Sequence, residues 1–425
     1  MNKKIINILE SIPREFFGGN MYDEREYKAV KRVIKKKTPF RYYGNELPSE
    51  TKKLEKKCSE YFNVKYAHAV NSGTGALSCA LHALGVTIGD EVVVPGYFWI
   101  SIVNMCIERG AIPILCDIDD SFNLDINDLE SKISNKTKCV VVVHMDGAQA
   151  KIDEIGNLCK KHGILVLEDF SQCIGGKYLE KKIGGFGDIS IASFQMNKMI
   201  TAGEGGIILT NNEEYYKKVQ VRSDGGYVRN DENSLISEKY ITYGEGRRYN
   251  EISAAIMNVQ LCKLENIFNE LKNNKKEILN ILGDIQPIKY RKIWDSDGEV
   301  CNTLMFIFPH KNDVNEFLDN YYKEMSNNEL RIYRICDCGY HLYYNCKNIV
   351  NKIDYLPGEF PWKYVDASKY NYDKGVLKNA DDLFERTIAV RLPCGMTRKQ
   401  RITLAKTLKY FIIKQKEHFV NYHRK

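Results

Sequence analysis

Lys198 is the residue whose surroundings point most clearly to chemistry in this sequence of 425 residues. It lies between the apolar run 189–194 and the glycine cluster Gly203-Glu-Gly-Gly206. Glycines let the backbone approach a ligand closely, because they carry no side chain. A lysine between apolar walls and near a bound cation has a lowered pKa and becomes a nucleophile. We therefore predict that Lys198 is a catalytic amine, although most lysines of this basic chain are surface charges.

Asp169 ends another apolar run, 163–169, and is followed by Phe170, Ser171 and Gln172. A carboxylate at the end of an apolar strand is costly to bury unless it is paired. A protonated heterocyclic nitrogen is one such partner. The alternative is a helix N-cap, a position where aspartate is common.

A third segment, residues 71–77 with the sequence NSGTGAL, is a small glycine-rich turn that runs into a helical stretch. Backbone N–H groups at a helix start, together with Ser and Thr hydroxyls, bind phosphate well. A plain helix cap is the alternative. The segment is neither a Walker A loop nor a dinucleotide fingerprint.

Short apolar runs that alternate with helical stretches would position these residues. Strands are predicted at 90–95, 111–117, 139–144 and 163–169, and the spacing of apolar residues predicts a helix over 151–162. Such strands favour an α/β fold with a parallel sheet covered on both faces. Ligands bind beyond the carboxyl ends of such strands, where His144, Asp169 and the loop after Pro95 lie.

The rest of the chain predicts two domains. Residues 1–30 look like a helical lead-in, 253–280 a long helix, and 398–418 a closing amphipathic helix. We expect a large ligand-binding domain over 1–280 and a smaller C-terminal α+β domain over 281–425.

Composition excludes several other classes of protein. The net charge of +7 is mild and scattered, and no nucleic-acid motif is visible. No apolar run reaches the roughly 18 residues that cross a bilayer. The 13 cysteines follow no signal peptide, so reduced thiols in the cytoplasm are expected. Cys336, Cys338, His341 and Cys346 do not have a recognised zinc spacing, and no metal is predicted.

Four motifs occur in the order typical of one family: NSGTGAL, GDEVVVPGYFW, EDFSQ and SFQMNKMITAGEGG. The chain closely resembles the DegT/DnrJ/StrS family of sugar aminotransferases from about Arg41 to Ala255, and more weakly to its end. The resemblance implies a fold-type I enzyme that depends on pyridoxal phosphate (PLP). Its mostly parallel central sheet would be covered by helices, with a smaller C-terminal α+β domain.

The resemblance also implies roles for the residues in these motifs. Lys198 would be the amine that bonds to the PLP aldehyde, and Asp169 would keep the pyridine nitrogen protonated. Gln172 would hydrogen-bond the phenolic oxygen. The phosphate would be held by Gly73, Thr74 and Ser193. Trp99 would stack on the PLP ring.

The implied reaction moves an amino group from glutamate or glutamine to a keto sugar, which would be nucleotide-linked, octulosonate-type or a cyclitol ketone. A homodimer with the active site near its interface is also implied. Gly246 stands where the family usually has an Asn that reaches the partner subunit's phosphate. Arg247 or Arg248 would replace it, and Arg248, which matches the family's own Arg, is a candidate substrate contact.

The segments VHMDGAQAKIDEI and EDFSQCIGGKY look closest to the subgroup of 8-amino-3,8-dideoxy-octulosonate transaminases. On that resemblance His341 is either a substrate contact or a structural histidine. The alternatives are a dehydratase or aromatising enzyme of the same fold and a non-catalytic PLP-binding regulatory protein. Deoxysugar dehydratases of the family replace the lysine by histidine, so Lys198 argues against that branch.

Overall fold

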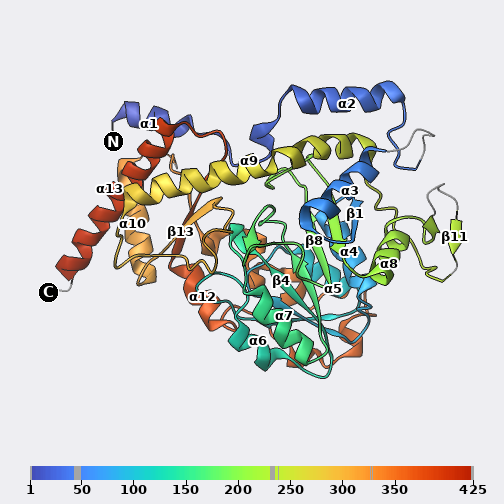
Figure 1. Ribbon diagram of the computed structural model, residues 1–425. Coiled ribbons are helices and arrows are strands. Elements are labelled where there is room, and N and C mark those ends of the chain that lie inside the picture. The colour runs from blue at the N-terminus through green and yellow to red at the C-terminus, as the bar shows by residue number, and fades with distance from the viewer. Residues whose placement is uncertain are drawn as a thin grey trace.

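A seven-stranded sheet forms the centre of the computed structural model, which describes residues 2–42, 49–229, 235–237, 239–325, 327 and 329–422 (Figure 1). The strands follow the spatial order β1 (Tyr66–Val70), β9 (Gly206–Thr210), β8 (Ile189–Ser193), β5 (Leu165–Asp169), β4 (Thr137–Val143), β2 (Glu91–Pro95) and β3 (Ile112–Cys116). Only β9 is antiparallel to its neighbours in this sheet. The predicted mostly parallel sheet is therefore confirmed, as are its four predicted strands.

Both faces of this sheet are buried. In β4 the side chains alternate, so that Val141 and Val143 join one apolar cluster while Val140 and Val142 join another. The first cluster is formed with α4 (Gly73–Ala83), α5 (Ser101–Glu108) and α8 (Glu213–Ser223). The second is formed with α3 (Glu50–Phe62), α6 (Ile126–Lys132), α7 (Ile152–Lys161) and α9 (Glu251–Leu282). Covering both faces explains why the strand sequences are continuously apolar.

Helix α9 joins the two ends of the molecule in Figure 1. The side chain of Asn250 caps its start by accepting from the Ser253 N–H, and Gly283 follows its last residue with a left-handed φ of 65°. It packs against α2 (Glu24–Lys36) and α3 at one end and against α13 (Arg398–Tyr422) at the other. The predicted long helix and the predicted closing helix are both confirmed.

A second, four-stranded sheet lies beside the C-terminal half of α9. Its spatial order is β12 (Lys289–Tyr290), β13 (Thr303–Ile307), β15 (Thr387–Arg391) and β14 (Ile332–Arg334), and all its pairings are antiparallel. Its core also takes in α10 (Lys311–Glu324), α13 and α1 (Lys3–Glu10), so the two termini lie on the same side (Figure 1). The smaller C-terminal sheet is thus present, while the division at residue 280 stays a prediction.

Several short elements complete the fold. They are α11 (Lys347–Val350), α12 (Lys378–Glu385) and the two-stranded pairs β6–β7 (Lys177–Tyr178, Lys181–Lys182) and β10–β11 (Val228–Arg229, Leu235–Ser237). Apolar residues between 335 and 384 join the cluster on the α4 and α5 face of the central sheet, which also includes Met305, Ile307 and Ala389 of the second sheet. In the described part of the chain, no helix is long and apolar enough to cross a membrane.

Glu168 holds together the carboxyl edge of the central sheet. Its fully buried carboxylate accepts hydrogen bonds from the backbone N–H groups of Gly184 (2.6 Å), Phe186 (2.9 Å) and Gly187 (2.9 Å). It also contacts Nε2 of buried His144 at 3.2 Å. Burial alone would raise the pKa of Glu168, but these hydrogen bonds lower it below its usual value. Because Asp169 is the next residue, this network fixes the strand end that carries it.

Replacing Glu168 by Ala should lower the free energy of unfolding by about 3–5 kcal/mol, because three buried N–H groups lose their acceptor. Urea unfolding at neutral pH would measure this. The control Glu154→Ala removes a solvent-exposed ion pair with Lys151 and should change stability by less than about 0.5 kcal/mol. Since the folded-state pKa is lowered, the contribution of Glu168 is full above its unfolded pKa of 4.5 and is lost as the pH falls through the folded value. Equal effects of the two variants would contradict this role.

Candidate active site

A cavity of about 860 Å³ opens at the carboxyl edge of the central sheet. The carboxyl ends of β1, β8 and β5 meet there because these strands are parallel to one another. Eight of the nine predicted site residues line this cavity: Gly73, Thr74, Trp99, Asp169, Gln172, Ser193, Lys198 and His341. Segments far apart in the sequence therefore converge as expected.

The start of helix α4 forms a cradle for an anion at one side of the cavity. Ser72 caps the helix, and its hydroxyl accepts from the Gly75 N–H at 2.9 Å. Among the residues described, the N–H groups of Gly73 and Thr74 have no hydrogen-bond partner. A Cβ on Gly73 would lie 2.7 Å from Cβ of Ser193, so this turn requires glycine. Free N–H groups at a helix start beside hydroxyls suit a phosphate.

Lys198 and Asp169 both line the cavity, and the charge of each affects the pKa of the other. Burial lowers the pKa of Lys198, and the negative charge of Asp169 opposes this shift. Burial likewise raises the pKa of Asp169, while a hydrogen bond from Ser171 and the charge of Lys198 oppose the rise. The Ser171 N–H donates to Oδ1 of Asp169 at 2.9 Å, and Oδ2 has no hydrogen-bond partner within the described ranges. A buried carboxylate with one free oxygen is suited to a cationic ligand atom.

Trp99 and His341 form an aromatic pair over the cavity, with ring centroids 5.0 Å apart. Trp99 is 47% exposed, so its ring is available to a ligand. His341 is tied to the backbone of Phe98 by a 3.0 Å contact from Nδ1, and burial lowers its pKa to about 4. It is therefore uncharged at neutral pH. Gln172 approaches the cavity with its Oε1 accepting from the Asp146 N–H at 3.2 Å.

Arg248 does not line this cavity. Its Nη1 lies 2.6 Å from Oδ1 of Asp224 and its guanidinium lies over the Phe40 ring. Arg247 pairs with Glu245 beside Gly75, on the outer side of the α4 turn. The family usually has an Asn at the position of Gly246. That Arg247 or Arg248 takes over the role of this Asn stays a prediction.

Other residues at the cavity were not predicted from the sequence. Arg14 and Glu15 come from the lead-in before α2, while Asn302, Arg331 and Arg391 come from the second sheet and its flanks. Arg391 lies in a run, ERTIAVRLPCGMT, that resembles the family. Nothing in that run indicates that its arginine faces the same cavity as Lys198, because that depends on how the two sheets pack.

A lysine facing a buried carboxylate, beside a phosphate cradle on this mostly parallel sheet, defines the class as PLP-dependent enzymes of fold type I. The chain belongs to the DegT/DnrJ/EryC1/StrS aminotransferase family, which it matches over residues 20–336. The family indicates transamination as the reaction and PLP as the cofactor.

The chain is similar to several named proteins. It is 35% identical to a GDP-perosamine synthase of Vibrio cholerae over 279 residues. This match covers 62% of this chain and 74% of that protein. It is 30% identical to an L-glutamine:2-deoxy-scyllo-inosose aminotransferase of Streptomyces kanamyceticus, over 60% of each chain. The match thus spans less than two thirds of that second relative. The structure of E. coli GDP-4-keto-6-deoxy-D-mannose-3-dehydratase with bound hydrated PLP matches with a TM-score of 0.74 at 22% identity, covering 91% of this chain and 96% of that one.

Gly73→Ala should weaken PLP binding by about tenfold or more, because the added Cβ displaces Ser193 or the helix start from the phosphate. Fluorescence titration of the cofactor-free protein with PLP would measure the affinity. Gly156→Ala is the matched control, since a Cβ on Gly156 in α7 meets open space. An unchanged affinity in Gly73→Ala would place the phosphate elsewhere.

Proposed function

We propose that this protein is a PLP-dependent aminotransferase that moves an amino group from glutamate or glutamine to a keto sugar in amino-sugar biosynthesis. The observation that carries the proposal is the convergence of Lys198, Asp169 and the α4 cradle on one cavity. The names of the relatives, a GDP-perosamine synthase and an inosose aminotransferase, support an acceptor that is a nucleotide-linked sugar or a cyclitol ketone. An octulosonate-type acceptor stays a prediction from the sequence.

The residues present fit PLP. The free N–H groups of Gly73 and Thr74, together with the Ser193 hydroxyl, would hold its phosphate. The free oxygen of Asp169 would hold a proton on the ring nitrogen, and Gln172 would hydrogen-bond the phenolic oxygen. The exposed ring of Trp99 would stack on the pyridine. When bound, PLP supplies an electron sink for a carbanion formed on the substrate.

Lys198 would carry out the proton transfer. Its pKa is lowered by burial, so a larger share of the amine is neutral and able to act as a base. With the donor bound in the cavity, Nζ of Lys198 would remove the proton from the donor's α-carbon. The neutral His341 and the apolar face of Trp99 would keep water away from this amine. The donor and the acceptor would use the same cavity in turn, which predicts ping-pong kinetics.

The alternatives are less well supported. The dehydratase similarity is at 22% identity and concerns the fold alone. Lys198 stands where deoxysugar dehydratases of the family carry histidine, which favours transamination. Aromatising enzymes of the same fold keep the lysine and remain the second candidate. A regulatory PLP-binding protein would not require the Lys198–Asp169 pair in one cavity.

We further propose a cytoplasmic homodimer with the active site near the interface, and domains over 1–280 and 281–425. Thirteen free thiols, all in the described part of the chain, support a reducing compartment. The two sheets on either side of α9 support the division. Size-exclusion chromatography with light scattering would test the dimer.

The purified protein should be yellow, with a visible absorbance band that borohydride abolishes. Lys198→Ala should lose that borohydride-sensitive band and nearly all turnover, because it removes the amine that bonds the cofactor. Lys160→Ala changes an exposed lysine of α7 and should leave both unchanged. A colourless protein that takes up no PLP, or wild-type turnover by Lys198→Ala, would overturn the proposal.

A screen of keto sugars would identify the acceptor. Glutamate and glutamine should each be tested against nucleotide-linked 4-keto sugars, cyclitol ketones and ulosonic acids, with formation of the keto acid as the signal. We expect turnover with one acceptor class to exceed the others by at least about tenfold, because a shaped cavity discriminates by its polar contacts. Release of an aromatic product would instead favour the aromatising alternative.

A further inference from the structure

Two arginines of the second sheet line the cavity but have no part in the cofactor roles above. Strands β14 and β15 are antiparallel, and Ile332 pairs with Val390. This register sets Arg331, just before β14, opposite Arg391 at the end of β15. Both side chains line the cavity that contains Lys198. The positive charge of Arg391 also contributes to the lowered pKa of Lys198, which is consistent with their proximity.

Arg391 is held in place by Asp146, a fully buried carboxylate. Nη2 of Arg391 lies 2.7 Å from Oδ1 of Asp146, and the Tyr97 hydroxyl donates to Oδ2 at 2.9 Å. Burial would raise the pKa of Asp146, but Arg391 and Arg291 lower it overall, so it is ionised at neutral pH. The buried carboxylate of Asp146 is therefore the counter-ion that fixes Arg391 at the cavity.

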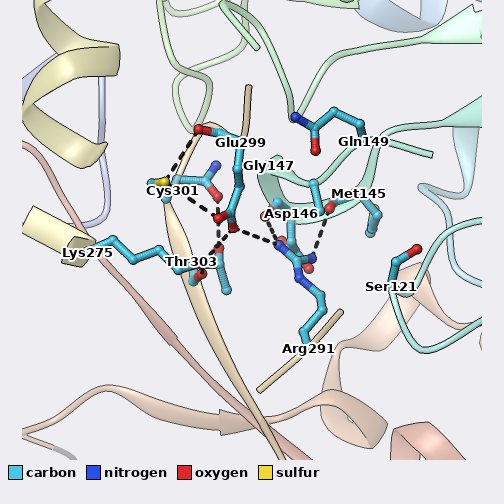
Figure 2. Close-up of polar contacts among 12 residues, drawn as sticks. Ser121, Met145, Asp146, Gly147, Gln149, Lys275, Arg291, Glu299, Cys301 and Thr303 are labelled. Atoms are coloured by element: carbon cyan, nitrogen blue, oxygen red, sulfur yellow. Dashed lines mark hydrogen bonds and ion pairs between the residues drawn. The ribbon is translucent and has the colours of Figure 1, made fainter. Parts of the chain in front are cut away.

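The backbone of Asp146 is fixed from below (Figure 2). Arg291 donates to the carbonyl oxygens of Met145 at 3.0 Å and Asp146 at 2.7 Å. Glu299 lies 3.8 Å from Arg291, and its Oε1 is 2.5 Å from Nζ of Lys275 on α9. These buried contacts hold Asp146 at a left-handed φ of 49°, a conformation uncommon outside glycine. The position of Arg391 thus depends on packed, buried groups.

Both arginines keep donors for a ligand. Apart from Asp146, Arg391 has one long hydrogen bond, 3.4 Å from Nη1 to the Thr303 hydroxyl, and its guanidinium lies 5.7 Å from the centre of the Tyr333 ring. Arg331 donates to the carbonyl oxygens of Ile12 (2.7 Å) and Pro13, which orient the guanidinium without neutralising it. Within the described ranges Arg331 makes no ion pair, while the negative charge of Glu15, in the same cavity, helps to raise the pKa of Arg391.

We propose that Arg391 and Arg331 form a recognition site for a carboxylate group of a substrate, with Asp146 as the residue that positions Arg391. The inference rests on the proposed function, since it names the chemistry that the same cavity binds. A planar guanidinium can bind a carboxylate with two parallel N–H bonds, and two facing arginines select for negative charge. The carboxylate belongs either to the amino-acid donor or to an acidic keto acceptor.

Binding of succinate, a dicarboxylate without an amino or keto group, tests the site directly. We expect calorimetry on the holoenzyme to show at least about a tenfold loss of succinate affinity in Arg391→Gln and a severalfold loss in Arg331→Gln. The matched control is Arg386→Gln, an arginine just before β15 that pairs with Asp382 at 2.5 Å and does not line the cavity. It should bind succinate within twofold of wild type.

Loss of the Asp146 ion pair also lowers stability, so folding must be separated from binding. Arg391→Lys keeps the charge and should retain part of the succinate affinity that Arg391→Gln loses. If both Gln variants bind succinate within twofold of wild type while Arg391→Gln melts at a lower temperature, the pair is merely structural and the inference is overturned.

Two half-reactions identify the source of the carboxylate. Stopped-flow absorbance gives the apparent Kd of glutamate in the first step and of an uncharged or acidic keto sugar in the second. A weaker glutamate step alone in Arg391→Gln assigns the donor's carboxylate, and a weaker step with the acidic keto sugar alone assigns the acceptor's. Succinate binding requires no turnover. Failure of the aminotransferase proposal would therefore leave this measurement intact, and loss of this site would leave the PLP band intact.

Discussion

The cost of burying a carboxylate is the constraint on which the rest of this structure depends. Three carboxylates lie buried at the carboxyl edge of the central sheet, and each is stabilised differently. Glu168 has a full set of backbone donors, and Asp146 has an arginine and a tyrosine hydroxyl. Asp169 has a donor on one oxygen only. Glu168 therefore belongs to the scaffold, whereas Asp169, which lines the cavity, keeps an oxygen for a ligand.

The parallel arrangement explains why these groups meet. Strands β4, β5 and β8 run in one direction, so their last residues lie along one edge. The hydrogen bonds of Glu168 then tie the loop at 184–187 to the residue before Asp169. Removing that support would move Asp169 relative to Lys198 and change the pKa of both groups. Stability and chemistry are therefore linked through adjacent residues of a single strand.

The second sheet completes the cavity rather than standing apart from it. Arg331 and Arg391 approach from β14 and β15, and the lead-in residues Arg14 and Glu15 lie beside them. The buried chain from Lys275 through Glu299 to Arg291 connects α9 to the loop at Asp146. Helix α9 thus contributes to the position of a cavity arginine although none of its residues lines the cavity. The two sheets are joined where a substrate would lie between them.

The sequence by itself determined the local pieces of the site. Continuous apolar runs predicted β2, β3, β4 and β5, because strands buried on both faces require apolar side chains at every position. The glycine-rich turn at 71–77 predicted a helix start that could bind phosphate, and the apolar run before Asp169 predicted a carboxylate at a strand end. Both features depend on residues that are adjacent in sequence. Only the tertiary structure decided that Arg331 and Arg391 share the cavity with Lys198 and that Asp146 fixes Arg391, because these contacts join segments more than 100 residues apart. It also placed Arg248 on Asp224 outside the cavity, a contact that no local pattern encodes.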